Sequence, residues 1–256
     1  SDGLDERWCD EGTMGGDELS NCFNHHYPIL REKITAGNFM LFNEALNAQD
    51  ANVFTSLVRK EFLQARFTIL GNFRSSDGIK QLQDLNSSGI DAVKFHCYFQ
   101  SITESDFSDV LTMAIAAANL HMPIFIDTSY GSLGMYQNDN LKLASYLLEK
   151  IDNVPIVLLH SGGARVLEAH LLADACPNAY LETSFTLPYY LGSSVERDLA
   201  FSYKKLSEKV VYGSDFPYVE MDKSIKTFHK FMQNWDFTEQ QIDNILNTNS
   251  TKIFGV

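Results

Sequence analysis

Four ionisable side chains of the kinds that bind metal ions or transfer protons fall at equivalent places along the chain. His96, Asp127, His160 and Asp215 each come at or just after the end of a short apolar run. If these runs are parallel strands joined by helices, their carboxyl ends meet on one face, where residues distant in sequence become neighbours. Imidazole and carboxylate groups ligate Zn²⁺ and also act as general acids and bases. The pattern therefore predicts one reactive site at the strand ends.

His160 and Asp215 are the strongest candidates for catalysis. His160 ends the run VPIVLLH and precedes SGG, a turn that lets a substrate approach the backbone. We expect it to be a ligand or a general base, the alternative being a helix cap acting through water. Asp215 lies in the turn GSDFP after the last apolar run, where it could bind a metal and accept a proton from bound water. Its alternative is a helix N-cap or a turn residue.

Lys94 and His96 stand two residues apart in one apolar run, so on a strand their side chains point to the same side. A Lys buried beneath a His needs a carboxylate partner, or its pKa shifts and it becomes reactive. The alternative for Lys94 is a plain ion pair with a neighbouring acid. Asp127 follows PIFI where the chain leaves the core. It is either a ligand or the group that orients His96 or His160.

The remaining histidines are weaker candidates, because they fall in expected helices, in loops at the opposite strand ends, or in a polar region that we do not place. They are His25, His26, His121, His170 and His229.

The elements that must position these groups are seven short apolar runs. Most are continuously apolar rather than alternating, as expected for parallel strands buried on both faces. They are residues 38–42, 66–71, 90–96, 123–128, 154–160, 178–184 and 209–214.

Helix-length amphipathic segments separate the strands, for example residues 77–87, 106–119 and 140–151. Repeated strand–helix alternation predicts a right-handed parallel β/α architecture. We expect a single distorted (β/α)8 TIM-barrel-like domain over residues 1–256, with an irregular segment over 1–37 and the first strand missing. A doubly wound open sheet is the alternative, but the Gly-rich phosphate loop typical of that fold is not found.

The composition of the chain restricts the classes of binding partner that we expect. The net charge of −13 and the pI near 4.9 disfavour nucleic acid and anionic membranes, although not an anionic small molecule. The longest apolar runs are too short to span a bilayer. The four cysteines form no CxxC pair and no secretory signal is found, so we expect reduced thiols in a cytoplasmic protein.

Several segments resemble the amidohydrolase-2 family of the amidohydrolase superfamily, which includes relatives of aminocarboxymuconate-semialdehyde decarboxylase. They are KFHCYFQ, PIFIDTSYG, VPIVLLHSGG, NAYLETS and VVYGSDFP, closed by ILNTNSTKIFGV. The resemblance covers about residues 38–256, and LLHSGG and GSDFP are its most specific parts. It implies a distorted TIM barrel with one divalent ion, usually zinc. It also implies metal ligation by Asp215, substrate polarisation or proton handling by His160, and a K-x-H motif at Lys94 and His96.

The chain departs from that family in two places. The family's first strand carries an H-x-H pair that supplies two metal ligands, and no H-x-H occurs here. The adjacent His25 and His26 would point to opposite sides of a strand and cannot replace it. Asp127 stands where the family usually has a histidine ligand. Two explanations stay open: the chain starts downstream of the first strand, consistent with Ser1 in place of Met, or it is a divergent member that works without metal.

These observations predict a metal-dependent hydrolase that acts on a small polar or carboxylate-bearing substrate through metal-activated water. The expected ligands of one divalent ion, most simply zinc, are Asp215, His160, His96 and Asp127, with Asp215 and His160 as catalytic groups. The expected substrate contacts are Lys94, Tyr98, Thr128 and Tyr130. The alternatives are a non-oxidative decarboxylase and a metal-free barrel with a binding role. A homodimer is expected because barrels of this type often pair.

Overall fold

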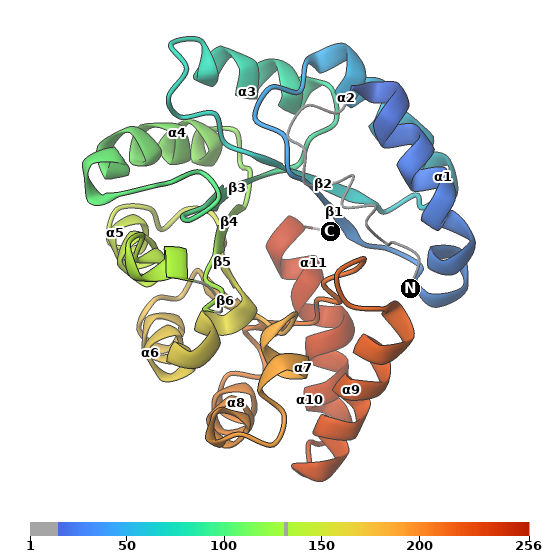
Figure 1. The fold of residues 1–256 in the computed structure, drawn as a ribbon, viewed down its shortest axis with the longest axis vertical. Coiled ribbons are helices and arrows are strands. Elements are labelled where there is room, and N and C mark those ends of the chain that lie inside the picture. Colours follow the sequence, from blue (N-terminus) through green and yellow to red (C-terminus); the bar gives the residue numbers. More distant parts are fainter. Residues whose placement is uncertain (1–14, 131–132, 256) are drawn as a thin grey trace. The chain divides into compact units, whose positions relative to one another are not determined.

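The structure describes residues 15–130 and 133–255 of the computed structural model, in which helices separate successive strands up to residue 211 and only helices follow (Figure 1). Its contacts divide the chain into two units: residues up to 94 with 109–122, and residues 95–108 with those from 123 on. The boundary passes through strand β3 (Ala92–His96) and helix α4 (Phe107–Asn119). Each unit contains parallel strands linked by helices, so the predicted α/β class is confirmed.

The first unit contains β1, β2 and the start of β3, in parallel register with Phe39 opposite Phe67 and Ile69 opposite Val93. Its elements are α1 (Gly16–Lys33), β1 (Asn38–Leu41), α2 (Ala48–Glu61), β2 (Arg66–Leu70) and α3 (Gly78–Ser87). The ring of Phe23 on α1 packs edge-on against Phe54 and Phe62, which joins α1 to α2. These aromatic contacts contribute to the core of the unit, together with buried aliphatic side chains such as Val58 and Ile69.

Helix α1 corrects one expectation. We expected residues 1–37 to be irregular, but residues 16–33 form a helix. Its buried side chains recur every three or four residues, which places them on one face. They are Leu19, Phe23, His26 and Leu30. Residues 1–14 lie outside the described ranges.

The second unit contains the parallel strands β4 (Ile124–Asp127), β5 (Ile156–Leu159), β6 (Ala179–Glu182) and β7 (Val210–Val211). Asp127 lies opposite Leu159, and Glu182 lies opposite Val211, so the carboxyl ends of these strands are level. Helices α5 (Asn140–Leu148) and α6 (Val166–Ala175) lie on the same side of the strands in Figure 1. Nearly every residue of these strands is buried, as expected for parallel strands with both faces covered.

The second unit contains further helices of three to fourteen residues. They are η1 (Glu104–Asp106), η2 (Leu133–Tyr136), η3 (His160–Arg165), α7 (Thr186–Tyr190), α8 (Ser194–Lys205), α9 (Met221–Asn234), α10 (Glu239–Asp243), the π-helical turn η4 (Asn244–Thr248) and α11 (Asn249–Phe254). The Asn249 side-chain amide donates to the carbonyls of Ser207 and Val210 at 2.7 Å each, which fixes α11 to β7.

All seven predicted strands are present, and each begins within two residues of its predicted start. The last is much shorter than predicted, because after Val211 the chain leaves the sheet and enters the turn that carries Asp215. In the described part of the chain, no helix has the length and apolar character needed to cross a bilayer. Cys22, Cys97 and Cys176 are thiols, and Cys9 lies outside the described ranges.

Candidate active site

The carboxylate of Asp127 lies between two imidazoles. Its Oδ2 atom is 3.3 Å from Nε2 of His96 and 3.2 Å from Nε2 of His160. Three strands deliver these groups, since His96 ends β3, Asp127 ends β4 and His160 follows β5 directly. All three residues are buried, and all belong to the second unit. The structure therefore brings together three of the four residues predicted as metal ligands.

The second oxygen of Asp127 is held by Ser129. Oδ1 accepts the Ser129 backbone N–H at 3.1 Å and the Ser129 hydroxyl at 2.6 Å. Because that hydroxyl hydrogen is used, the Tyr98 hydroxyl must donate in its own contact with Ser129 Oγ, at 3.1 Å. Tyr98 also packs edge-on against the His96 ring, with centroids 4.2 Å apart. Tyr98, predicted to touch substrate, thus lies beside the cluster and supports His96.

His160 sits on an unusual turn. Four successive residues, 160–163, have φ values of 64, 49, 80 and 55°. For His160 and Ser161 this left-handed backbone is unfavourable by roughly 1–2 kcal/mol each. Gly163 is required by space, because a Cβ atom there would lie 2.6 Å from the Tyr130 backbone nitrogen. The SGG sequence therefore lets the chain reverse sharply with the imidazole facing Asp127.

The hydrogen bonds of His160 define its protonation. Nδ1 lies 3.2 Å from the Ser184 carbonyl oxygen, which can only accept, so Nδ1 carries a hydrogen. Nε2 faces the carboxylate of Asp127, which also accepts. Burial alone would lower the pKa of His160, but the charge of Asp127 and the hydrogen bond to it, with further charges of Glu182 and Asp215, raise that pKa to about 9. The geometry and the pKa both indicate an imidazolium.

Glu182 is a site residue that the sequence reasoning missed. It ends β6 fully inside the protein and accepts the His160 N–H at 3.0 Å and the Ser184 N–H and hydroxyl, both at 2.7 Å. Burial raises the pKa of the Glu182 carboxyl, although the His160 charge and these hydrogen bonds oppose the shift. The signal was present in the sequence, since an acid at the end of the apolar run 178–184 occupies the same place as Asp127 does in its run.

Asp215 lies in the turn after β7, with a positive φ of 57°, and its charge contributes to the raised pKa of His160. The four predicted ligands do not fit a metal ion as they stand. No group of three or more His, Cys, Asp or Glu side chains within 15–130 and 133–255 is arranged to hold one. We therefore assign no chemical step to an ion, and the zinc site stays a prediction.

The other predicted substrate contacts are engaged with the protein. The Thr128 hydroxyl donates to the Leu159 carbonyl and accepts from Gly162 N–H, which braces β4 against the turn after β5. The Tyr130 hydroxyl contacts Asp139 and Arg165. Their contact with substrate stays a prediction.

Lys94 belongs to the first unit, where its Nζ lies 4.3 Å from the centroid of the Phe42 ring. It is buried, as predicted for the K-x-H segment, and its role in binding substrate stays a prediction.

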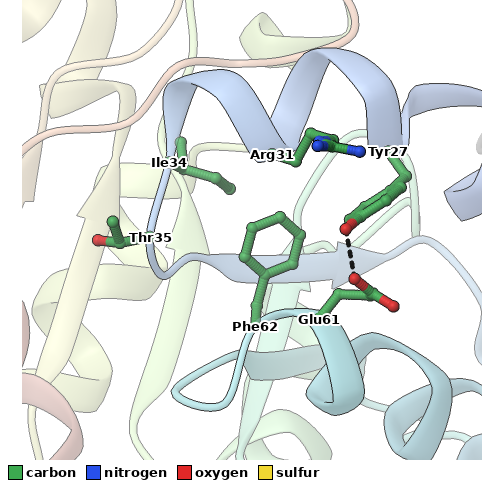
Figure 2. Close-up of a pocket in the computed structure, with 6 residues that line it drawn as sticks. All are labelled: Tyr27, Arg31, Ile34, Thr35, Glu61 and Phe62. Atoms are coloured by element: carbon green, nitrogen blue, oxygen red, sulfur yellow. Dashed lines mark hydrogen bonds between the residues drawn. The ribbon is translucent and has the colours of Figure 1, made fainter.

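A hollow of about 440 Å³ lies elsewhere, on the first unit (Figure 2). The residues that line it come from the ends of α1 and α2 and the segments that follow them. They are Tyr27, Arg31, Ile34, Thr35, Glu61 and Phe62. In Figure 2 the Tyr27 hydroxyl hydrogen-bonds to the Glu61 carboxylate, an exposed contact. The hollow contains no buried acid or histidine, so we do not place the reactive site there.

The comparison with protein families shows to which family the chain belongs. Residues 77–256 match the amidohydrolase-2 family model, described as Amidohydrolase. The chain belongs to the amidohydrolase family. No curated protein sequence matches it. The matched region includes His96, Asp127, His160 and Asp215, so the whole cluster lies within the part of the chain that this family accounts for.

Solved structures similar to this amidohydrolase share its fold. An uncharacterized TIM-barrel protein from Bordetella bronchiseptica has a TM-score of 0.66 at 15% identity, over 82% of this chain and 72% of that one. A probable 2-pyrone-4,6-dicarboxylic acid hydrolase from Acinetobacter baumannii has a TM-score of 0.62 at 15% identity, over 94% and 89%. A 4-oxalomesaconate hydratase from Rhodopseudomonas palustris has a TM-score of 0.57 at 11% identity, over 96% and 84%. At such identities the likeness shows the fold alone, and it confirms the predicted TIM-barrel-like class.

Proposed function

We propose that the chain is a hydrolase that acts on a small polar or carboxylate-bearing substrate at the Asp127 cluster. One observation carries the proposal: Asp127 Oδ2 lies within 3.3 Å of one imidazole and 3.2 Å of another, in a buried cluster at strand ends. Membership of the amidohydrolase family supports the reaction class. Imidazole is the side chain that most often transfers protons in general acid–base catalysis, and carboxylates also do so.

In this proposal, Asp127 and His160 move the protons and His96 positions Asp127. The oxygen of a water molecule forms a bond to the substrate's carbonyl carbon, and the proton it loses passes to Asp127 Oδ2. The bond to the leaving oxygen or nitrogen breaks, and His160 Nε2 gives that atom its proton. Transfer of the proton from Asp127 to His160 across 3.2 Å then restores the starting state. Proton transfer of this kind contributes about 10²–10⁴-fold to a rate.

A panel of lactones, amides and carboxylates tests the proposal on the purified protein, with product and CO₂ release measured together. We expect hydrolysis of one class, and a loss of about 10²-fold or more in His160→Gln and Asp127→Asn. His121→Gln is the matched control, since His121 lies on the other unit. CO₂ release from a carboxylate would instead identify the decarboxylase predicted as the alternative.

The rival from another class is a barrel that binds a ligand without turnover. It is favoured by the fact that the donors in the described ranges form no metal-holding group. Metal analysis of the same preparation, with and without added zinc or manganese, distinguishes the hydrolase from the barrel that only binds a ligand. A stoichiometric ion that is lost in Asp215→Asn would support the predicted metal-activated water. No turnover on any substrate class, with or without metal, would leave the binding role. The cytoplasmic location and the homodimer also remain predictions.

A further inference from the structure

Each histidine that contacts Asp127 is bordered by a phenylalanine with accessible surface. The Phe99 ring lies 5.7 Å from the His96 ring and is 44% exposed. The Phe185 ring lies 5.8 Å from the His160 ring, nearly perpendicular to it, and is half-buried. Large apolar side chains that stay exposed beside a cluster of reactive groups commonly mark a ligand-binding surface.

Phe185 continues into a second ring at the surface. Tyr189 stacks on Phe185 with centroids 5.0 Å apart and an interplanar angle of 22°, and Tyr189 is 61% exposed. Both belong to the short helix α7 or its N-cap. An aromatic path therefore leads from the His160 imidazole through Phe185 to the solvent, entirely within the second unit.

Helix α7 is fastened in this position at both ends. The Thr186 hydroxyl donates to the His160 carbonyl, and the Tyr190 hydroxyl donates to the Tyr130 carbonyl at 2.7 Å. The stacked pair is thus held beside the two strand ends that carry His160 and Asp127, and it is positioned by hydrogen bonds that the rings themselves do not make.

The backbone of Phe185 has φ 53° and ψ −59°, close to the rare and strained classic γ-turn, and a positive φ is an outlier for a bulky side chain. Such outliers persist where the surroundings impose them and concentrate at ligand-binding sites. The alternative explanation is a pair four residues apart that only stabilises its own helix. A helix of only five residues gains little from such a pair. Stabilisation of the helix would also not require the Phe185 ring to contact His160.

We infer that Phe185 and Tyr189 form a stacking platform for a planar, unsaturated ring of the substrate, whose polar group then reaches His160. The inference rests on the proposed function only for the location of the reactive groups. A flat ring gains from face or edge contact with aromatic side chains, whereas a puckered saturated ring of similar size gains only from burial.

Benzoate and cyclohexanecarboxylate test this platform, because they carry the same charge and nearly the same size and differ in planarity. Their dissociation constants for the full chain can be measured by ligand-observed NMR. We expect benzoate to bind about 2- to 10-fold more tightly. Tyr189→Leu should abolish the preference while keeping apolar surface, and Phe185→Leu should do the same. Since Tyr189 is exposed, its variant decides the matter if Phe185→Leu folds poorly.

Phe201→Leu is the matched control. Phe201 is also about half exposed, and its ring also borders a buried histidine, His170, at 5.1 Å, but on α8 and away from Asp127. The preference should survive in this variant. Equal affinity for both acids, absence of binding by either, or a preference that persists in Tyr189→Leu would overturn the inference. Binding of benzoate needs no turnover, so a platform without hydrolysis would refute the proposed function alone, and hydrolysis without ring preference would refute the platform alone.

Discussion

A Cβ atom on Gly213 would lie 1.5 Å from Oε1 of Glu182, so the Glu182 carboxylate occupies the space that any other residue at 213 would fill. The turn after β7 and the acid at the end of β6 are thereby fitted to each other. Glu182 accepts hydrogen bonds from the His160 N–H and the Ser184 hydroxyl, so the close contact with Gly213 also affects the position of residues in the candidate active site.

The contact between Gly213 and Glu182 can be tested by adding a side chain at position 213. Gly213→Ala should displace Glu182 and lower the free energy of unfolding by about 1–3 kcal/mol, the usual range for overpacking. Chemical denaturation followed by circular dichroism measures the loss. Gly37→Ala is the control, since a Cβ there makes ordinary contacts at 3.4 Å or more. Equal stability of the two variants would show that Glu182 moves aside without cost.

Ser184 should be needed for activity more than for folding. The Ser184 hydroxyl donates to Glu182 at 2.7 Å and lies 3.0 Å from His160 Nδ1. Ser184→Ala removes both contacts, so the His160 imidazole is held less firmly in its orientation. We expect at least a roughly 10-fold fall in kcat, in line with the loss of groups that orient reactive residues. Ser202→Ala removes a similar contact, 3.1 Å from Nδ1 of His170, outside the site. A similar fall in kcat in both variants would contradict the special role of Ser184.

The buried hydroxyl of Tyr203 should contribute measurably to stability. The Ser161 hydroxyl donates to the Glu182 carbonyl, so Tyr203 must donate to Ser161 Oγ across 2.9 Å. Burial raises the pKa of Tyr203, which keeps this donor protonated at all ordinary pH values. Tyr203→Phe should cost about 0.5–1.5 kcal/mol in thermal or chemical denaturation. Tyr180→Phe, which removes a half-buried hydroxyl that makes no such bond, should cost much less.

The lowered pKa of His170 should reduce the free energy of unfolding in mild acid. Burial lowers its pKa below the ordinary value of 6.5, and nearby Lys205 adds to that effect while Asp174 opposes it. The unfolded chain therefore takes up this proton first as the pH falls below 6.5, and the native state loses stability until its own lower pKa is passed. The stability of His170→Gln should depend less on pH in this window. His229→Gln, at an exposed position, should behave as the unmodified chain does.

The sequence predicted the elements better than it predicted the contacts. Predominantly apolar runs identified the seven strands of the described residues, because strands covered on both faces carry apolar side chains at most positions. Helix α1 was missed because its buried positions are diluted by polar residues and interrupted by Pro28. The meeting of His96, Asp127 and His160 was predicted from their places at strand ends. That one carboxylate oxygen serves both imidazoles depends on register and rotamers, which a linear pattern does not encode.

Glu182 shows why a candidate site is harder to predict than a fold. Acids at strand ends are recognisable, but the reason for this one lies in Gly213, 31 residues later, where the absence of a side chain makes room for it. A glycine in a turn has many explanations in a sequence, and only the three-dimensional structure distinguishes local backbone freedom from space that a distant side chain occupies.

The backbone N–H of His160 points to a carboxylate 22 residues away rather than to a neighbouring strand carbonyl. This amide can be shielded from water only after β6 has docked beside β5 and Glu182 has been enclosed. Its hydrogen-exchange rate would then report the opening of that whole region instead of local fraying. During folding, slow exchange at this one position would mark the moment when the candidate active site becomes assembled.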